Sequence, residues 1–241
     1  MAEQEVIKHT KKIIDISTEK DTGFWHKAKD FLLEIFIIVF AVSLSISFHN
    51  WSEHRNEQNQ VKTFLLGLRQ DIREDLADAK GDLLEYEQYR RAYTWLNGFD
   101  ENGLPNSDTL KQALNITGNT TSFRTHSSRF TGFLSAGKIM NIENDSLTQD
   151  ILNYYQEVVP DLKSSEDGWF GIHGRLRIFL EDNVTGPETD KTKLSALTTP
   201  KGRHLTRLLI PWPQLIERYH TVIDRGNAII AAIDKTYPGE K

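Results

Sequence analysis

The stretch VKTFLLGLRQDIREDLADAKGDLLEY, residues 61–86, determines the fold of this chain. Its apolar side chains recur every three or four residues, which is the spacing of one face of an α-helix. The pattern predicts a long amphipathic helix that ends near Asn97 and Gly98, with an apolar stripe that must pack against a second copy or against later helices. This stripe consists of Val61, Phe64, Leu65, Leu68, Ile72, Leu76, Ala79, Leu83 and Tyr86.

A continuous apolar run precedes that helix. Residues 31–48 read FLLEIFIIVFAVSLSISF, and 13 of these 18 residues are Phe, Leu, Ile or Val. At a helical rise of about 1.5 Å per residue the run spans roughly 27 Å, close to the thickness of the hydrocarbon core of a bilayer. We therefore predict a transmembrane helix in contact with the lipid bilayer. A cleaved signal peptide is the main alternative, but the run starts late in the chain and is longer than the apolar region of such peptides.

Three residues are predicted to act as membrane anchors. Trp25 and Trp51 flank the apolar run, and tryptophan is enriched at membrane interfaces. Glu34 lies one turn from the start of the run, so it can reach the headgroups and costs less than the roughly 3 kcal/mol of a central acidic residue. A contact between Glu34 and another membrane helix is the alternative interpretation.

The apolar run divides the chain into a short tail (1–30), the transmembrane helix (31–48) and a large following domain (49–241). The tail holds six lysines, and basic residues favour the cytoplasmic side of a membrane. Close to the membrane this bias nearly vanishes, because Arg55, Lys62 and Arg69 follow the run. We expect the tail in the cytoplasm and the domain on the opposite side.

The rest of the chain predicts more helices and shows no sustained strand pattern. We expect one helix from near Ser107, a second over 128–140, a third from a capping box of Ser146 and Gln149 to a break at Pro160, a fourth over 169–180, a polar linker over 183–200, and a last helix from Pro213 to near Pro238. The predicted fold is all-α: one N-terminal transmembrane helix continues into a long helix, and a helical-bundle ectodomain of four to six helices follows.

An acidic stripe follows the long helix. It comprises Asp71, Asp75, Asp78, Asp82 and Glu85, and none of them has a lysine or arginine four residues further on. Like charges at helical spacing cost about 0.2–0.5 kcal/mol each. A solvated face is the simplest interpretation, and docking of a basic partner or a divalent cation is the functional alternative. Carboxylates spread along a helix do not converge as a calcium site requires.

Two motifs resemble binding sites. GFLSAGK at 132–138 matches the start of a phosphate-binding P-loop, but Ile139 stands where a hydroxyl residue is needed, and no buried strand precedes it. GWFGIHGRLR at 168–177 could bind an anion. For both segments the preferred interpretation is close packing of a helix.

Composition narrows the function further. The chain has no cysteine, which excludes thiolate zinc sites and a cysteine nucleophile, and its eight histidines show no metal-ligand spacing. A net charge of −5 provides no general basic surface, which argues against a nucleic-acid partner. We therefore predict no catalytic, cofactor or metal site.

Three segments carry a resemblance to a family. They read HNWSEHRNEQ at 49–58, FLLGLRQDIREDL at 64–76 and FTGFLSAGKIMNIENDSLTQDILNYYQ at 130–156. In order and spacing they resemble a family of uncharacterised single-span proteins of Gram-negative envelopes. The resemblance covers about 31–156, implies a membrane topology and a helical fold, and transfers no active site.

These observations lead to one expected function and two alternatives. We expect a non-enzymatic, single-pass protein of the inner (cytoplasmic) membrane with its ectodomain in the periplasm. The ectodomain would act as an assembly or accessory subunit, as a homo-oligomer or together with other envelope membrane proteins. The alternatives are a ligand sensor that signals through the continuous helix and an enzyme with an unrecognised site.

Overall fold

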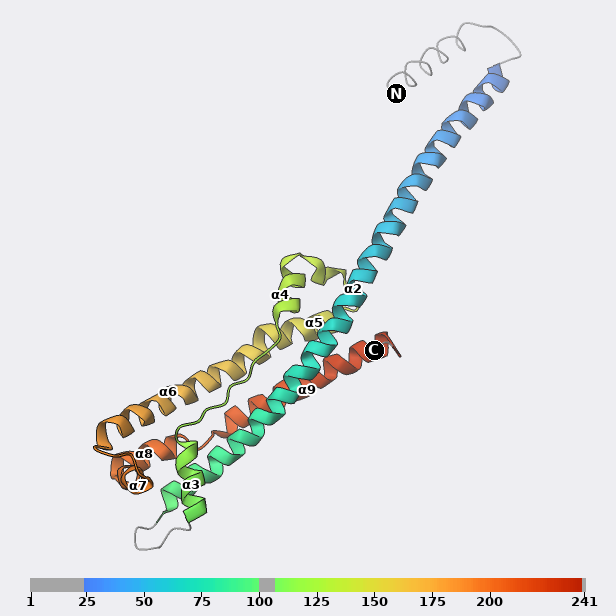
Figure 1. Ribbon diagram of the computed structural model, residues 1–241. Coiled ribbons are helices and arrows are strands. Elements are labelled where there is room, and N and C mark those ends of the chain that lie inside the picture. The colour runs from blue at the N-terminus through green and yellow to red at the C-terminus, as the bar shows by residue number, and fades with distance from the viewer. Residues whose placement is uncertain (1–23, 100–106, 240–241) are drawn as a thin grey trace. The chain divides into compact units, whose positions relative to one another are not determined.

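The computed structural model describes residues 24–99 and 107–239, and no strand occurs among them (Figure 1). The prediction of an all-α fold with a long N-terminal helix is confirmed. The α-helices are α2 (Phe24–Gly98), α3 (Ser107–Ile116), α4 (Ser128–Ser135), α5 (Asp145–Asn153), α6 (Val159–Asn183), α7 (Asp190–Thr198), α8 (Pro200–Leu208) and α9 (Pro213–Thr236). A 3₁₀ turn, η1 (Lys138–Asn141), and a π-helical turn, η2 (Tyr154–Val158), complete the set. The chain forms two compact units, Met1–Gln58 and Asn59–Lys241.

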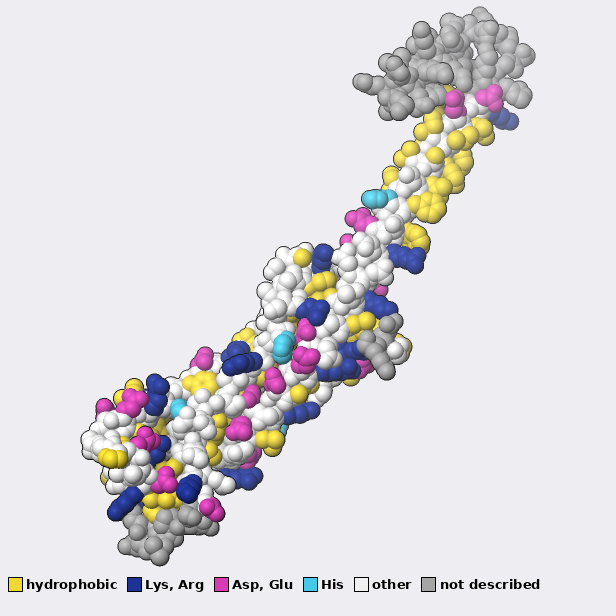
Figure 2. Space-filling model, in the orientation of Figure 1, with side chains coloured by type: hydrophobic (Ala, Val, Ile, Leu, Met, Phe, Trp, Pro, Cys, Tyr) yellow, Lys and Arg dark blue, Asp and Glu magenta, His cyan; other side chains and the backbone are white. Residues whose placement is uncertain are grey.

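The first unit contains the N-terminal part of α2, whose apolar side chains are exposed. Phe36 and Phe48, for example, are 65% and 62% exposed, and apolar side chains cover this stretch in Figure 2. In the described part of the chain, α2 is the helix long and apolar enough to cross a membrane, with a window of mean hydropathy 2.5. Removing one large apolar side chain from water contributes about 1.5–3 kcal/mol, so this surface favours an apolar environment.

The second unit is built on three long helices: α2 from Asn59 onward, α6 and α9. Helix α6 packs against α9. Helix α9 approaches α2 closely at Gly226, where an added Cβ would lie 2.8 Å from Leu76 Cδ2. Helix α6 meets α2 through Trp169, whose ring stacks on that of Tyr89 at 5.3 Å between centroids. The apolar stripe of α2 therefore faces α6 and α9 of its own chain.

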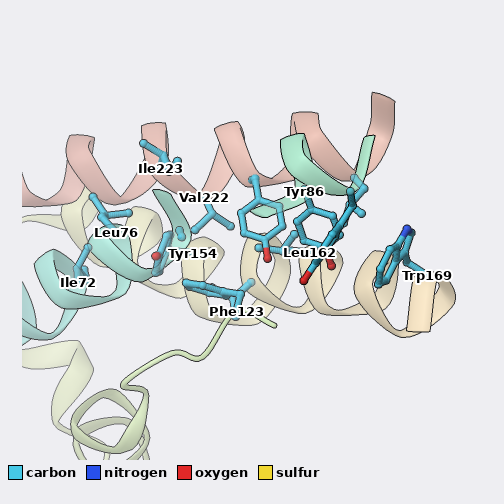
Figure 3. Packing of buried hydrophobic residues seen from close by; sticks show 14 of the residues in the cluster. Ile72, Leu76, Tyr86, Phe123, Tyr154, Leu162, Trp169, Val222 and Ile223 are labelled. Atoms are coloured by element: carbon cyan, nitrogen blue, oxygen red, sulfur yellow. The ribbon is translucent and has the colours of Figure 1, made fainter. Parts of the chain in front are cut away.

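The core between these helices is rich in large side chains (Figure 3). All members of the predicted stripe are buried except Leu83, which is half-buried. Trp169 is fully buried, and its indole Nε1 donates a hydrogen bond to the carbonyl oxygen of Leu209 at 3.1 Å. Phe123, which belongs to the chain between α3 and α4, also inserts its ring into this core. The prediction that the long helix packs one apolar face is confirmed.

The predicted break at Pro160 is wrong. Helical structure continues from Asp145 to Asn183 through α5, η2 and α6. Proline has no N–H and clashes with the preceding turn, so an α-helix cannot pass through it without adjustment. Here the π-helical turn Tyr154–Val158, which ends two residues before the proline, provides that adjustment. The predicted capping box is also wrong, because Asn144 caps α5 and accepts a hydrogen bond from the N–H of Leu147.

The predicted polar linker over 183–200 contains a helix. Helix α7 begins at a capping box formed by Thr189 and Thr192, and α8 follows directly from Pro200. The described residues thus contain more helices than the four to six expected, because α7 and α8 are only nine residues each and α7 lacks an apolar period. Arg203 of α8 donates to the carbonyl oxygens of Asn97 and Phe99 at 2.9 and 2.8 Å, which satisfies the C-terminal end of α2.

Candidate functional site

The most elaborate polar arrangement surrounds residues 119–127, NTTSFRTHS, here named the α3–α4 segment. It has no regular secondary structure, and Figure 1 shows it running from α3 to α4 beside α2 and α6. A segment outside helices and strands must find other partners for its backbone N–H and C=O groups. A carboxylate of α2 and a carboxylate of α6 each accept a hydrogen bond from one backbone N–H of the segment.

Asp75 of α2 binds the end of the segment. Its carboxylate is 0% exposed and accepts hydrogen bonds from the backbone N–H of His126 and from Thr125 Oγ1, both at 2.8 Å. His126 Nδ1 lies 2.6 Å from the same carboxylate. This hydrogen bond raises the pKa of His126. Asp75 therefore fixes the segment through one backbone group and two side chains.

Glu166 of α6 binds the middle of the segment. It is 2% exposed, and its Oε1 accepts hydrogen bonds from the N–H of Phe123 at 2.9 Å and from the hydroxyl of Tyr219 at 2.5 Å. Burial raises the pKa of Glu166, although both hydrogen bonds oppose that shift. Lys163 Nζ donates to the carbonyl oxygen of Phe123 at 3.2 Å. The backbone of Phe123 is thus satisfied on both sides while its ring enters the core.

Two further members of the acidic stripe also have partners from this part of the chain. Asp82 accepts a hydrogen bond from the hydroxyl of Thr121, and burial raises the pKa of Asp82. Asp71 pairs with Arg129 of α4, with 2.8 Å between Nε and Oδ2. Asp71, Asp75 and Asp82 thus hold groups that follow them by 39–58 residues in the sequence.

The solvated-face interpretation of the stripe is therefore only partly correct. Asp78 and Glu85 are exposed, as that interpretation requires. It is wrong for Asp75, which is fully buried. Docking of a basic partner or a divalent cation on the stripe stays a prediction. Within residues 24–99 and 107–239, no group of three or more His, Asp or Glu side chains is placed to hold a metal ion.

The three predicted membrane anchors belong to the first unit. The side chain of Trp25 lies outside the described residues. Glu34 is half-buried, whereas Trp51 is exposed, with the Arg55 guanidinium 5.6 Å from its ring centroid. A tryptophan in a cation–π contact with an arginine suits an interface between an apolar and an aqueous phase. Their anchoring role stays a prediction.

The two glycine-containing motifs each place aromatic side chains in packing contacts. In the motif at 132–138 the ring of Phe133 stacks on that of Phe64 at 3.8 Å, and Gly137 takes a left-handed conformation at φ +70°. The motif at 168–177 lies inside α6, where His173 is buried and stacked on Trp169 at 5.5 Å. Burial lowers the pKa of His173, so its imidazole stays neutral at neutral pH. The aromatic side chains of both motifs thus pack as predicted, whereas Gly132, Gly171 and Gly174 have no atom within 4 Å of an added Cβ and do not mark close helix contacts.

Sequence reasoning missed two concave surfaces of the second unit. A cavity of about 860 Å³ lies between α2 and α3, and a groove of about 510 Å³ lies between α2 and α4. The cavity is lined by Leu84, Glu85, Glu87, Gln88, Tyr89, Arg91, Ala92, Trp95, Thr109, Gln112, Ala113, Asn115, Ile116 and Asn119. Because each surface combines residues distant in sequence, no local motif could have indicated either one.

Within the described residues, the fold defines a class of protein: a helical protein with one candidate membrane span and a helical second unit in which carboxylates hold an irregular segment. A family model described as "Family of unknown function (DUF6090)" matches residues 34–163, which is more than half of the chain. The chain therefore belongs to the DUF6090 family. Comparisons with curated proteins and with solved structures find no match.

Proposed function

We propose that this chain is a non-enzymatic, single-pass protein of the inner membrane of a Gram-negative envelope. Its helical second unit lies in the periplasm and acts as an assembly or accessory subunit. It works with a second copy of itself or with other envelope membrane proteins.

The exposed apolar surface of α2 carries the proposal of membrane anchoring. Large apolar side chains are exposed along α2 from Leu32 to Phe48, and without a membrane all of them would contact water. A run of 18 residues at helical rise matches the hydrocarbon thickness, so a bilayer would cover the whole surface at once.

A partner surface is supported by the cavity between α2 and α3. Leu84 is 66% exposed at this cavity, and Tyr89, Arg91 and Trp95 also line it. Tyr89 is buried against Trp169, whereas Arg91 is exposed and Trp95 half-buried, and tryptophan and arginine are enriched among the side chains that dominate binding energy at protein interfaces. An exposed leucine beside them provides an apolar contact that a partner would bury.

The internal use of the polar groups supports a non-enzymatic role. Asp75 and Glu166 are buried carboxylates, the kind of residue from which catalytic acids and bases are built. Both are occupied by hydrogen bonds that hold the α3–α4 segment. Their geometry serves stability, because each carboxylate satisfies a backbone N–H that has no helical partner.

The topology can be tested with single cysteines, because the chain contains none. Ser17→Cys reports on the tail, and Asp224→Cys reports on an exposed position of α9. In cells with a permeabilised outer membrane, a membrane-impermeant maleimide should label Asp224→Cys, whereas Ser17→Cys should react only after lysis. The reverse pattern would overturn the orientation, and a chain recovered entirely in the soluble fraction would overturn the anchor.

The partner surface can be tested by photo-crosslinking in cells. A photoreactive amino acid at Leu84 should give a discrete product whose mass equals two copies or one copy plus an envelope membrane protein. The matched control is Ile178 of α6, which is also exposed but lies outside the cavity. Equal product from both positions, or none from Leu84, would contradict the proposed surface.

A further inference from the structure

We infer that the groove between α2 and α4 binds one anionic phospholipid of the membrane in which the chain is anchored. This inference rests on the proposed membrane anchoring. The groove has an apolar floor, a basic rim and room for part of a lipid molecule.

The floor of the groove is apolar. Phe64 of α2 and Phe133 of α4 form it with rings stacked at 3.8 Å and 5° from parallel. Gly132 and Ala136 contribute little side-chain volume, and a Cβ added at Gly132 would meet no atom within 4 Å. The volume of about 510 Å³ lies in the range of small-molecule sites. An acyl chain or a glycerol backbone suits such a floor.

The rim of the groove is basic. Among the described residues that line it, Arg129 and Lys138 are charged and none is acidic. Arg129 uses Nε to bind Asp71, and its guanidinium lies over Gly67, where a Cβ would be 2.4 Å from Cζ. Lys138 Nζ donates to Gln60 Oε1 at 2.7 Å, and an ammonium group has three donors in all. Both cations thus retain N–H groups for a phosphate.

Two cations above an aromatic floor specify an anionic amphiphile. A free phosphate would gain nothing from the apolar floor, and a neutral apolar molecule would make no use of the N–H groups that Arg129 and Lys138 have beyond their bonds to Asp71 and Gln60. Basic pockets close to membrane spans attract anionic lipid headgroups by charge, and burial of acyl-chain carbon on an apolar floor adds to that attraction.

The length of the chain between span and groove favours a membrane lipid over a soluble amphiphile. Asn59, the first groove residue, follows Phe48 by 11 residues. Even fully extended, such a segment spans no more than about 40 Å. The anchor therefore keeps the groove at a high effective concentration of headgroups.

The first test inserts an acidic side chain into the groove. The full-length chain is placed in nanodiscs of phosphatidylcholine with or without phosphatidylglycerol, and retained lipids are counted by native mass spectrometry. Ala136→Glu puts a carboxylate in the groove, so retention of phosphatidylglycerol should fall roughly tenfold through like-charge repulsion. Ser135→Glu adds the same charge at a neighbouring exposed position that does not line the groove, and it should retain lipid like the wild type.

The second test fills the groove without changing charge. Gly132→Leu adds apolar volume where no atom lies within 4 Å, and it should reduce phosphatidylglycerol retention as strongly as Ala136→Glu. Gly171→Leu makes the same change at an exposed position of α6, also with no atom within 4 Å, and should have no effect. Thermal melts of all four variants show whether each one folds.

The outcomes separate this inference from the proposed function. An equal loss of phosphatidylglycerol retention in a groove variant and its control would overturn the lipid site. Equal retention of phosphatidylcholine and phosphatidylglycerol by the wild type would overturn it as well. In either case the cysteine labelling still tests the membrane anchor independently. Competition by glycerol phosphate, which has no acyl chain, would show a free-phosphate site and would likewise overturn the inference.

Discussion

Replacing Asp75 by alanine should strongly destabilise the second unit. The substitution removes a fully buried carboxylate that accepts hydrogen bonds from the N–H of His126 and the hydroxyl of Thr125, both at 2.8 Å, and contacts the His126 imidazole at 2.6 Å. The end of the α3–α4 segment then loses its partner on α2.

The magnitude follows from these contacts. A hydrogen bond to a charged group contributes about 1.5–3 kcal/mol. The contributions of the three hydrogen bonds do not simply add, because the His126 side chain is 51% exposed and water can replace part of its lost hydrogen bond to Asp75. We therefore expect a loss of about 3 kcal/mol, which for a domain of this size lowers the melting temperature by roughly 6–12 °C.

The assay is a thermal melt of the full-length chain in detergent, followed by tryptophan fluorescence. Trp169 is fully buried, so its emission reports on the packing of α2 against α6. The control is Asp78→Ala, which removes an exposed carboxylate of the same stripe and should change stability by no more than about 0.5 kcal/mol. Equal melting temperatures for the two variants would refute the argument that the stripe holds the segment.

Three further predictions concern packing and pH. Gly226→Ala should destabilise by about 1–3 kcal/mol, because its Cβ would lie 2.8 Å from Leu76, whereas Gly171→Ala, with no atom within 4 Å, should be neutral or stabilising in the same melts. Glu166→Gln keeps an oxygen for both hydrogen bonds and removes a buried charge, so the variant should be at least as stable as the wild type at pH 8. Because burial raises the pKa of Glu166, protonation of this carboxylate favours the folded state. The wild type should therefore gain stability relative to the variant as pH falls toward 4.5. Because the pKa of His126 is raised, the stabilisation of the folded state by its protonated imidazole is complete below about pH 6.5 and is lost as pH rises through the folded-state pKa. His126→Gln should therefore flatten the decline in the free energy of unfolding above pH 6.5, measured by urea titrations at several pH values.

The sequence predicted those helices that have a sustained apolar period or a proline at their start. The apolar stripe of α2 recurs over many turns, and Pro213 marks the start of α9. Helices α7 and α8 escaped prediction because they are nine residues each, and α7 in addition lies in a Thr- and Lys-rich stretch. Pro160 by itself indicates a helix break, and nothing in the neighbouring sequence indicates that a π-helical turn accommodates the proline.

The candidate site escaped prediction for a different reason. The acidic residues of α2 were visible as a stripe, but their partners lie beyond the reach of helical spacing. Asp75 is paired with His126, 51 residues away, and Asp71 with Arg129, 58 residues away. Only the tertiary fold brings these charges and donors together. The spacing of the acidic residues along the stripe therefore does not indicate that Asp75 is buried.

The most direct test of the proposed role is native mass spectrometry of the tagged full-length chain, gently extracted from its own membranes. The proposed assembly role predicts a stoichiometric complex with a second copy or with another envelope membrane protein. A clean monomer under extraction conditions that preserve other membrane complexes would contradict it.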